Sequence, residues 1–278
     1  MPAAPPPPRR AHRAVAAVLC SVALLSASCA SSSSPTRDGA APEGPPERLV
    51  VTVHRSYPHD RRAFTQGLEL ADADSYFEST GLQGRSSVRR VRLDSGEVIA
   101  RRDLDPSQFG EGLTRVDERL VQLTWKDGVA RVYDATTLEP LEDLTYEGEG
   151  WGLCHDGTHL VMSDGSDTLA IRDPGTFEVV ERVRVTRDGK PVQRLNELEC
   201  VDGAIYANVF QTEEILRIDR GSGRVTGVID ASGLLAADDA ANVDVLNGIA
   251  YDHTRGVFLL TGKLWPKLFE VTFEPAST

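Results

Sequence analysis

A carboxyl group, several amides and large aromatic side chains recur at similar places along this chain. Five short segments place a Gly, or in one case Glu197, before a Leu or Ile, and neighbouring segments are 40 to 51 residues apart. The residues just before these positions are Gln66, Glu111, Trp151, Asn196 and Asn247. A carboxyl group shielded from water by aromatic rings has a raised pKa, which suits it to give and take protons near neutral pH. Glu111 is therefore the candidate catalytic residue.

The spacing of these segments predicts the architecture that would position them. Repeats of 40 to 50 residues are typical of β-propeller blades, which contain four strands each. Short alternating runs separated by Asp-Gly turns occur within the repeats, and we interpret these pairs as turn residues rather than as calcium ligands. The fifth repeat has one strand too few, and residues 49–53 can supply it. We predict an all-β, five-bladed β-propeller whose N-terminal strand closes the last blade.

A ring of blades would bring a second set of equivalent positions to the same end of the central axis. These positions, at the ends of the second strands, hold Thr80, Trp125, Gly165, Phe210 and Thr261. Lys263 and Trp265 follow shortly after the last of them. Aliphatic or small residues would be enough to fill a channel, whereas aromatic walls around polar groups are typical of a ligand site. We therefore expect this end of the propeller to be the functional one.

Three further glutamates and one long spacing lie outside this pattern. Glu147 and Glu149 precede Trp151, and we expect them to stay solvated. Glu197 replaces the repeated Gly, so we expect it to hydrogen-bond backbone amides of neighbouring blades rather than to act in catalysis. Residues 232–245 account for the longest spacing, and we interpret them as a short helix or an insertion.

The overall composition bears on partners and cofactors. With 42 acidic and 30 basic residues among 278, the chain carries a formal charge of −12, which disfavours nucleic-acid binding. No His, Cys or Asp cluster has the spacing of a metal site, so we expect neither a metal nor another cofactor. Cys154 and Cys200 could form a disulfide in an oxidising compartment, but we favour buried free thiols that fill inner strands. We expect a monomer.

The first 47 residues have the features of an export signal and a tether. Three Arg precede an apolar run at residues 14–25, which is too short to cross a bilayer. The run ends in Leu-Ser-Ala-Ser before Cys29, which resembles a bacterial lipoprotein cleavage site, although the Leu lies one position further from the cysteine than usual. Cleavage without lipidation is the alternative. We predict a signal peptide at 1–29 that is lipidated at Cys29, a flexible Ser/Pro linker at 30–47 and a catalytic domain at 48–278. The protein would then face the periplasm in a bacterial cell envelope and contact a membrane only through its lipid.

Seven sequence runs, which together span nearly the whole predicted domain, carry a family resemblance. They are Phe-Thr-Gln-Gly-Leu from Phe64, Phe-Gly-Glu-Gly-Leu-Thr from Phe109, Leu-Thr-Trp from Leu123, Gly-Trp-Gly-Leu from Gly150, Leu-Asn-Glu-Leu-Glu from Leu195, Leu-Asn-Gly-Ile-Ala-Tyr-Asp from Leu246 and Thr-Gly-Lys-Leu-Trp-Pro from Thr261. A single run would be weak evidence of a family relationship, but seven runs in the same order are strong evidence. Together they resemble the glutaminyl-peptide cyclotransferases of the plant and bacterial type, which are five-bladed propellers unrelated to the animal zinc enzymes.

The resemblance implies cyclisation of the N-terminal glutamine of peptides or proteins to pyroglutamate, with release of ammonia. It places the family's catalytic acid on Glu111. It places the substrate-binding residues on Phe64, Gln66, Phe109, Trp125, Trp151, Asn196 and Lys263. One position departs from the family, which usually has Trp where this chain has Phe210; Phe keeps a stacking face but lacks the indole N–H. The sequence does not assign separate roles to Gln66, Asn196 and Lys263.

Two other functions stay open at this point. A propeller without catalytic activity could bind peptides or envelope partners as a lipoprotein, since a fold does not determine a function. A five-bladed glycosidase would need two carboxylates beside the scissile bond, whereas the ring positions carry only one. Glu111 among the aromatic residues favours the cyclotransferase over both.

Overall fold

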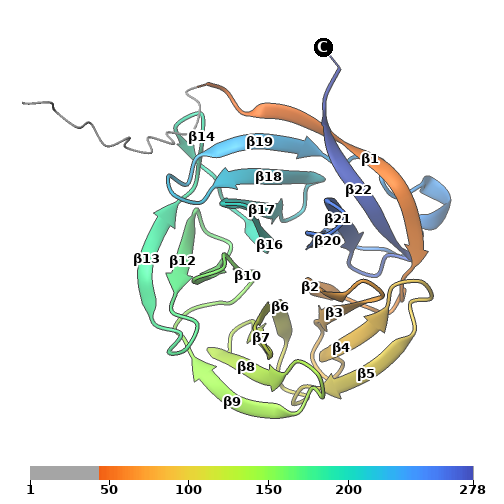
Figure 1. Ribbon diagram of the computed structural model, residues 1–278, viewed down its shortest axis with the longest axis vertical. Coiled ribbons are helices and arrows are strands. Elements are labelled where there is room, and N and C mark those ends of the chain that lie inside the picture. The colour runs from red at the N-terminus through yellow and green to blue at the C-terminus, as the bar shows by residue number, and fades with distance from the viewer. Residues whose placement is uncertain (1–43, 278) are drawn as a thin grey trace, which may run out of the picture. The chain divides into compact units, whose positions relative to one another are not determined.

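Antiparallel strands make up almost all of the regular structure of residues 44–277, which are the part of the chain that this computed structural model describes (Figure 1). The strands form four-stranded units around a central axis, and the first strand of each unit lies nearest to that axis. The prediction of an all-β propeller is therefore confirmed.

The units follow one another along the chain. The first contains β2 (Thr65–Asp72), β3 (Ser75–Thr80), β4 (Ser87–Arg92) and β5 (Val98–Asp103). The second contains β6 (Gly110–Val116), β7 (Arg119–Thr124), β8 (Val129–Asp134) and β9 (Pro140–Thr145). The third contains β10 (Leu153–His155), β11 (Leu160–Met162), β12 (Thr168–Arg172) and β13 (Val179–Arg184). A ribbon of β14 (Thr186–Arg187) and β15 (Lys190–Pro191) precedes the fourth, which contains β16 (Leu195–Val201), β17 (Ala204–Val209), β18 (Glu214–Asp219) and β19 (Val225–Asp230). The last contains β20 (Leu246–Asp252), β21 (Val257–Gly262), β22 (Lys267–Pro275) and β1 (Glu47–Pro58).

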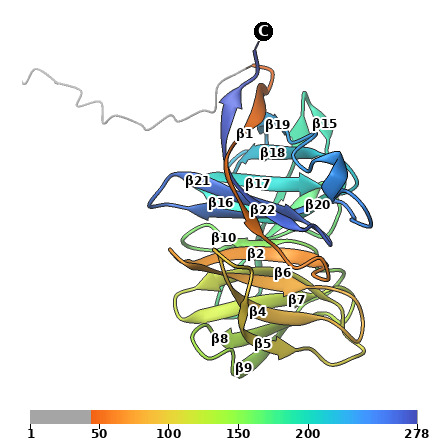
Figure 2. The same cartoon turned by 90° about the vertical axis from the view of Figure 1, so that its right-hand side faces the viewer.

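The N-terminal strand closes the ring, as predicted. β1 pairs antiparallel with β22, with Val51 opposite Phe273, and Figure 2 shows the two strands running side by side. The sequence did not predict that the first residues of β1 also pair in parallel with β19, where Leu49 lies opposite Ile229. Because β1 has 12 residues rather than the five expected, it reaches both neighbours and joins the last two units into one eight-stranded sheet.

The repeated Gly has a steric cause. A Cβ added at Gly67 would lie 2.5 Å from the backbone nitrogen of Leu113, and one at Gly112 would lie 2.6 Å from the backbone nitrogen of Leu153. Gly152 stands against the backbone of the next unit in the same way. Each of these glycines therefore lets two inner strands of neighbouring units touch at the axis, where a side chain would not fit.

The core lies between neighbouring sheets. Residues of the third and fourth units, such as Val161, Ile171 and Leu198, pack in one buried cluster. Cys154 belongs to this cluster, the partly buried Cys200 packs against it, and the two form a disulfide between β10 and β16. The expectation of free thiols is therefore wrong. Adjacent inner strands hold the two Cα atoms 5.5 Å apart, a distance that suits a disulfide.

The segment before the last unit contains little regular structure. It forms a single 3-10 turn, η1 (Ala237–Asp239), where a short helix or an insertion was predicted.

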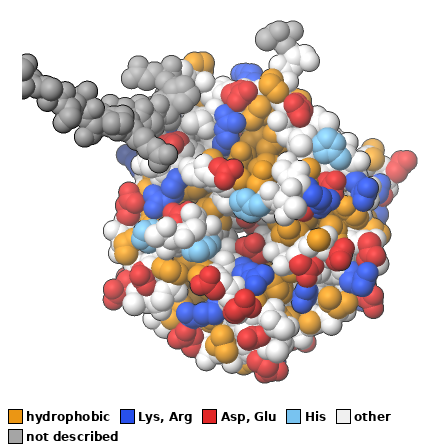
Figure 3. All heavy atoms as spheres, in the orientation of Figure 1, with side chains coloured by type: hydrophobic (Ala, Val, Ile, Leu, Met, Phe, Trp, Pro, Cys, Tyr) orange, Lys and Arg blue, Asp and Glu red, His pale blue; other side chains and the backbone are white. Residues whose placement is uncertain are grey.

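Within residues 44–277 we find no helix long and apolar enough to cross a membrane. On the face shown in Figure 3, acidic and basic side chains are intermixed rather than gathered by sign. The predicted signal peptide and Cys29 lie outside the described residues.

Candidate active site

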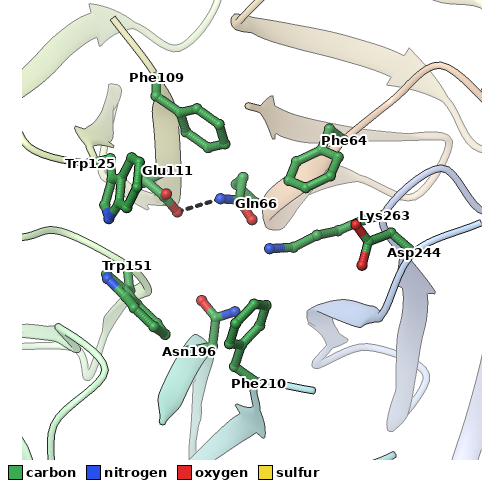
Figure 4. A pocket seen from close by; sticks show the side chains of 10 residues that line it. All are labelled: Phe64, Gln66, Phe109, Glu111, Trp125, Trp151, Asn196, Phe210, Asp244 and Lys263. Atoms are coloured by element: carbon green, nitrogen blue, oxygen red, sulfur yellow. Dashed lines mark hydrogen bonds between the residues drawn. The ribbon is translucent and has the colours of Figure 1, made fainter. Parts of the chain in front are cut away.

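A pocket opens at one end of the central axis, where the inner strands begin and the second strands end. Its lining comes from Phe64, Gln66, Phe109, Glu111, Trp125, Trp151, Asn196, Phe210, Asp244 and Lys263 (Figure 4). The structure thus brings together the candidate catalytic residue and all eight residues expected to bind substrate, and it adds Asp244. Figure 4 shows the polar side chains pointing toward one another, with aromatic rings around them.

Glu111 lies at the start of β6 and is almost completely buried, with 5% of its surface exposed. Gln66, at the equivalent place on β2, donates a hydrogen bond from Nε2 to Oε2 of Glu111 at 2.7 Å. Burial raises the pKa of Glu111 well above its ordinary value, and the positive charge of Lys263 and the Gln66 bond reduce this rise without cancelling it. The carboxyl group can therefore hold a proton at a pH where an exposed glutamate would have lost it.

A glutamate that was expected to stay solvated organises one wall of the pocket. Both indole N–H groups, from Trp125 at 2.8 Å and from Trp151 at 3.0 Å, donate to the same Oε2 atom of Glu149. Its other carboxylate oxygen lies 3.4 Å from Nζ of Lys126. Glu149 keeps 39% of its side-chain surface exposed, so it stays partly solvated as expected but also has this structural role, and Glu147 is exposed as predicted. An exposed Glu two positions before a Trp carries no pattern that could have indicated this contact.

Glycines behind the aromatic side chains fix the position of the rings. A Cβ at Gly81 would lie 2.3 Å from the ring of Phe109, and a Cβ at Gly165 would lie 2.8 Å from the ring of Trp151. The ring of Phe210 meets Trp151 edge to face, with centroids 5.6 Å apart. Gly165, one of the predicted ring positions, thus supports the wall from behind instead of lining the pocket.

Lys263 reaches toward the pocket centre from the turn that follows β21 (Figure 4). Only 4% of its surface is exposed, and its Nζ lies 4.9 Å from the ring centroid of Phe64 and 5.1 Å from that of Phe210. Burial lowers its pKa, although the negative charges of Glu111 and Asp244 act in the opposite direction. The lysine is therefore a cation held among aromatic rings beside the candidate catalytic carboxyl.

A buried network holds this turn in place. Both ring nitrogens of His59 face acceptors, the carbonyl oxygen of Trp265 at 2.7 Å and Oε1 of Glu78 at 2.9 Å. Glu78 also accepts a hydrogen bond from Nε of Arg89 at 2.7 Å, and Arg89 reaches Asp60 at 3.0 Å. Although burial raises the pKa of Glu78, the charges of Arg89 and His59 lower it to about 2. The first unit thus fixes the turn of the last unit that presents the lysine.

Some predicted ring positions lie beneath the pocket instead of lining it. Asn247 is fully buried and donates from Nδ2 to the carbonyl oxygen of Thr65 at 3.0 Å. Thr80 and Thr261 are buried and hydrogen-bond within their own units. Asn247 thus joins the inner strands β20 and β2, whereas Thr80 and Thr261 tie second strands to third strands, and none of the three lines the pocket.

Glu197 has the structural place that the sequence predicted. Its carboxylate accepts hydrogen bonds from the backbone N–H of Leu68 at 3.1 Å and from that of Ile249 at 2.8 Å. These two residues belong to the first and last units, so the carboxylate links three inner strands across the axis. Glu197 does not line the pocket.

Asp244 is the lining residue that the sequence missed. It precedes β20 and is exposed at the pocket rim. Its backbone N–H donates to the carbonyl oxygen of Lys263 at 2.9 Å, and its carbonyl accepts from Nε1 of the buried Trp265 at 2.9 Å. Because it lies in the irregular segment outside the repeat, no periodic pattern marks it.

Among residues 44–277, no group of three or more His, Cys, Asp and Glu side chains is placed to hold a metal ion.

Comparison with known proteins settles the family. A sequence model of the glutamine cyclotransferase family matches residues 20–273. The chain belongs to this family. It is 42% identical over 231 residues to a glutaminyl-peptide cyclotransferase of Arabidopsis thaliana, an alignment that covers 82% of this chain and 72% of that protein. The crystal structure of Myxococcus xanthus glutaminyl cyclase is also 42% identical and has a TM-score of 0.78, with 84% of this chain and 100% of that chain covered. The predicted family and the prediction of an enzyme are confirmed.

Proposed function

We propose that this enzyme converts the N-terminal glutamine of peptides and proteins into pyroglutamate and releases ammonia, with Glu111 as the general acid and base. Membership of the glutamine cyclotransferase family supports the reaction. The observation that carries the role of Glu111 is its buried carboxyl group with a raised pKa, which is hydrogen-bonded by Gln66 at the floor of an aromatic pocket.

The reaction needs a proton carrier but no nucleophile from the protein. The free α-amine of the substrate attacks the carbon of its own side-chain amide, and a five-membered lactam forms. The bond from that carbon to the amide nitrogen then breaks, and the nitrogen leaves as ammonia. One proton must pass from the attacking nitrogen to the leaving nitrogen. A single carboxyl group that first accepts and then delivers this proton is sufficient.

The other polar side chains divide the remaining tasks. Gln66 uses its amide N–H on Glu111, and its Oε1 is buried without a hydrogen-bond partner in the described structure, so an N–H group of the substrate can fill this acceptor. Lys263 and the side chain of Asn196 point into the pocket and can stabilise the oxygen that becomes negative during attack (Figure 4). The aromatic walls hold the folded substrate and keep out water, which would otherwise deamidate it.

Ammonia release from a peptide that begins with glutamine tests the proposal. The same peptide with an acetylated N-terminus is the matched control, because it has the same side chain but no free amine to attack. We expect ammonia and a pyroglutamyl peptide from the first substrate only. Binding of the free peptide without ammonia release would contradict the proposal and support a peptide-binding lipoprotein without activity.

We also propose that the protein is exported and anchored in a bacterial envelope through lipidated Cys29. The apolar run, the small residues before the cysteine and the Ser/Pro stretch after it support this. Cys29→Ser should move the protein from the membrane fraction to the soluble exported fraction. Unchanged fractionation, with an unlipidated N-terminus in the parent protein, would contradict the anchor.

A further inference from the structure

A second hollow lies beside the pocket. Its lining comes from residues 211–213 after β17, from the irregular segment around η1 that leads into β20, and from Trp265. Asp244 lines both hollows, so the two adjoin at this residue. We call this second hollow the Asp244 groove.

The rim beside Asp244 is the place where a bound peptide can leave the pocket with the smallest loss of backbone hydrogen bonds. The other walls are aromatic rings, from Phe64, Phe109, Trp125, Trp151 and Phe210, and the carboxylate of Glu149 at the two indoles already accepts both of their N–H groups and pairs with Lys126. A peptide backbone that crosses such a ring loses water from its N–H and C=O groups without gaining a partner. The carboxylate of Asp244 is exposed at the rim and can accept a hydrogen bond from the N–H of the second residue. The chain that follows the glutamine should therefore enter the groove.

The groove carries negative charge that is not neutralised by an ion pair within the described residues, although Lys263 in the adjoining pocket acts electrostatically on Asp244. Its ionisable lining residues are Glu213 and Asp244, both exposed, and the lining that the structure describes contains no Lys or Arg. On η1, by contrast, Asp239 is neutralised by Lys267 at 2.6 Å and by Arg61 at 3.6 Å. Among residues 44–277, Glu213 and Asp244 have no such ion pair.

We propose that the Asp244 groove binds the second and third residues of the substrate and favours Lys or Arg there. The inference rests on the proposed function, since it concerns the peptide that follows the cyclised glutamine. A cationic head group would pair with Glu213 and Asp244. The aliphatic part of the same side chain would lie on Leu235 and Val243, which are half-buried in the lining. An acidic residue at either position would be repelled.

The test compares amidated peptides that begin Gln-Lys-Ala, Gln-Ala-Lys, Gln-Ala-Ala, Gln-Glu-Ala and Gln-Ala-Glu. Ammonia release at low ionic strength gives kcat/KM for each. We expect the lysine peptides to exceed the glutamate peptides by about tenfold, the order that two exposed charge pairs produce. Added salt should reduce this ratio, because exposed charges are screened.

Two double variants separate the groove from the general negative charge of the protein. Glu213→Gln/Asp244→Asn removes both groove charges and should bring the lysine-to-glutamate ratio close to one. Asp74→Asn/Glu118→Gln makes the same charge change in the β2–β3 and β6–β7 turns, which join the opposite ends of inner strands from the pocket. This control should keep the ratio.

The outcomes distinguish the two proposals. If Gln-Ala-Ala is cyclised but lysine and glutamate peptides react equally well, the groove proposal is wrong and the proposed function stands. A preference for lysine that survives unchanged in the Glu213→Gln/Asp244→Asn variant would also overturn the groove proposal, because it would come from the net charge of the whole molecule. If no glutamine peptide releases ammonia, both proposals fail.

Discussion

Replacing Glu111 by Gln should remove most of the turnover while leaving the fold intact. The two side chains have nearly the same shape, and the new amide oxygen can still accept the bond that Gln66 donates at 2.7 Å. Of the lining residues that the structure describes, Glu111 is the one buried carboxyl group, so the lining offers no second proton carrier of this kind. General acid–base catalysis contributes about 10²–10⁴-fold, which corresponds to about 2.7–5.4 kcal/mol. We expect kcat to fall by that factor.

The pH dependence gives a second readout of the same variant. A carboxylate must accept the proton first, so wild-type activity should fall as the pH drops below the raised pKa of Glu111. The α-amine of the substrate, with an ordinary pKa of about 7.7–8.0, must also be deprotonated and therefore produces its own limb in the pH profile of activity. The variant should keep the limb of the substrate and lose that of the enzyme, as measured by ammonia release across the pH range.

Glu199→Gln is the matched control. Glu199 is also buried, burial also raises its pKa, and it accepts a hydrogen bond from the backbone N–H of Tyr251, but it does not line the pocket. Its replacement should leave kcat nearly unchanged. The reasoning is refuted if Glu111→Gln keeps more than about a tenth of wild-type kcat, which lies outside the expected range, or if both variants lose activity equally.

Glu111→Gln should raise the stability of the protein at neutral pH, although it lowers the activity. Because the folded state holds the Glu111 proton above the ordinary pKa, unfolding releases that proton, and wild-type stability falls as the pH rises from the ordinary pKa toward the raised one. The variant cannot lose this stability. Its thermal midpoint should equal that of wild type in acid and exceed it at neutral pH. A lower midpoint at both would mean that Glu111 ties the blades together structurally.

Three further predictions concern stability and substrate binding. Replacing Cys154 and Cys200 by Ala should lower the free energy of unfolding by about 4 kcal/mol, since the disulfide joins residues 46 apart; an unchanged urea midpoint would contradict the bond. Glu78→Gln should cost about 3–5 kcal/mol at neutral pH, because it removes the closer carboxylate partner of buried Arg89 and leaves only Asp60. With the pKa of Glu78 lowered to about 2, this difference should vanish as the pH falls toward that value, and denaturant titrations that show no such convergence would argue against the network. Phe210→Trp should change KM for glutamine peptides more than kcat, because it alters a wall of the pocket; a selective fall in kcat would show that this position touches the proton transfer.

The sequence could predict the ring of inner strands and the pocket positions that follow from the repeat. The close approach of inner strands requires Gly at positions such as Gly67 and Gly112, so the spacing of those glycines reveals the ring. The residue before each Gly then falls at the pocket, as Gln66 and Glu111 do. The same argument placed Asn247 at the pocket wrongly, because the repeat pattern does not say whether a side chain points to the pocket or between strands.

Features that depend on irregular chain paths could not be predicted. Asp244 reaches the rim from a segment without a repeat, and Glu149 meets two indoles through the shape of a loop. The disulfide depends on two cysteines of adjacent inner strands, 46 residues apart, facing each other. Spacing alone left that pairing open, because Cys154 and Cys200 fit a buried core equally well as thiols.

The double pairing of β1 also determines the order in which the molecule can be completed. The strand is made before any other part of the propeller, yet its partner strands come last: the hydroxyl of Tyr57 bonds to Glu270 of β22, 213 residues later, and Leu49 lies opposite Ile229 of β19. Until β19 and β22 have emerged, β1 has no partner, and such long-range pairing is slow and leaves strand edges open to other chains. A chain of this kind therefore gains from being kept unfolded until its last strand is available, and its folding should be most vulnerable to aggregation just before the ring closes.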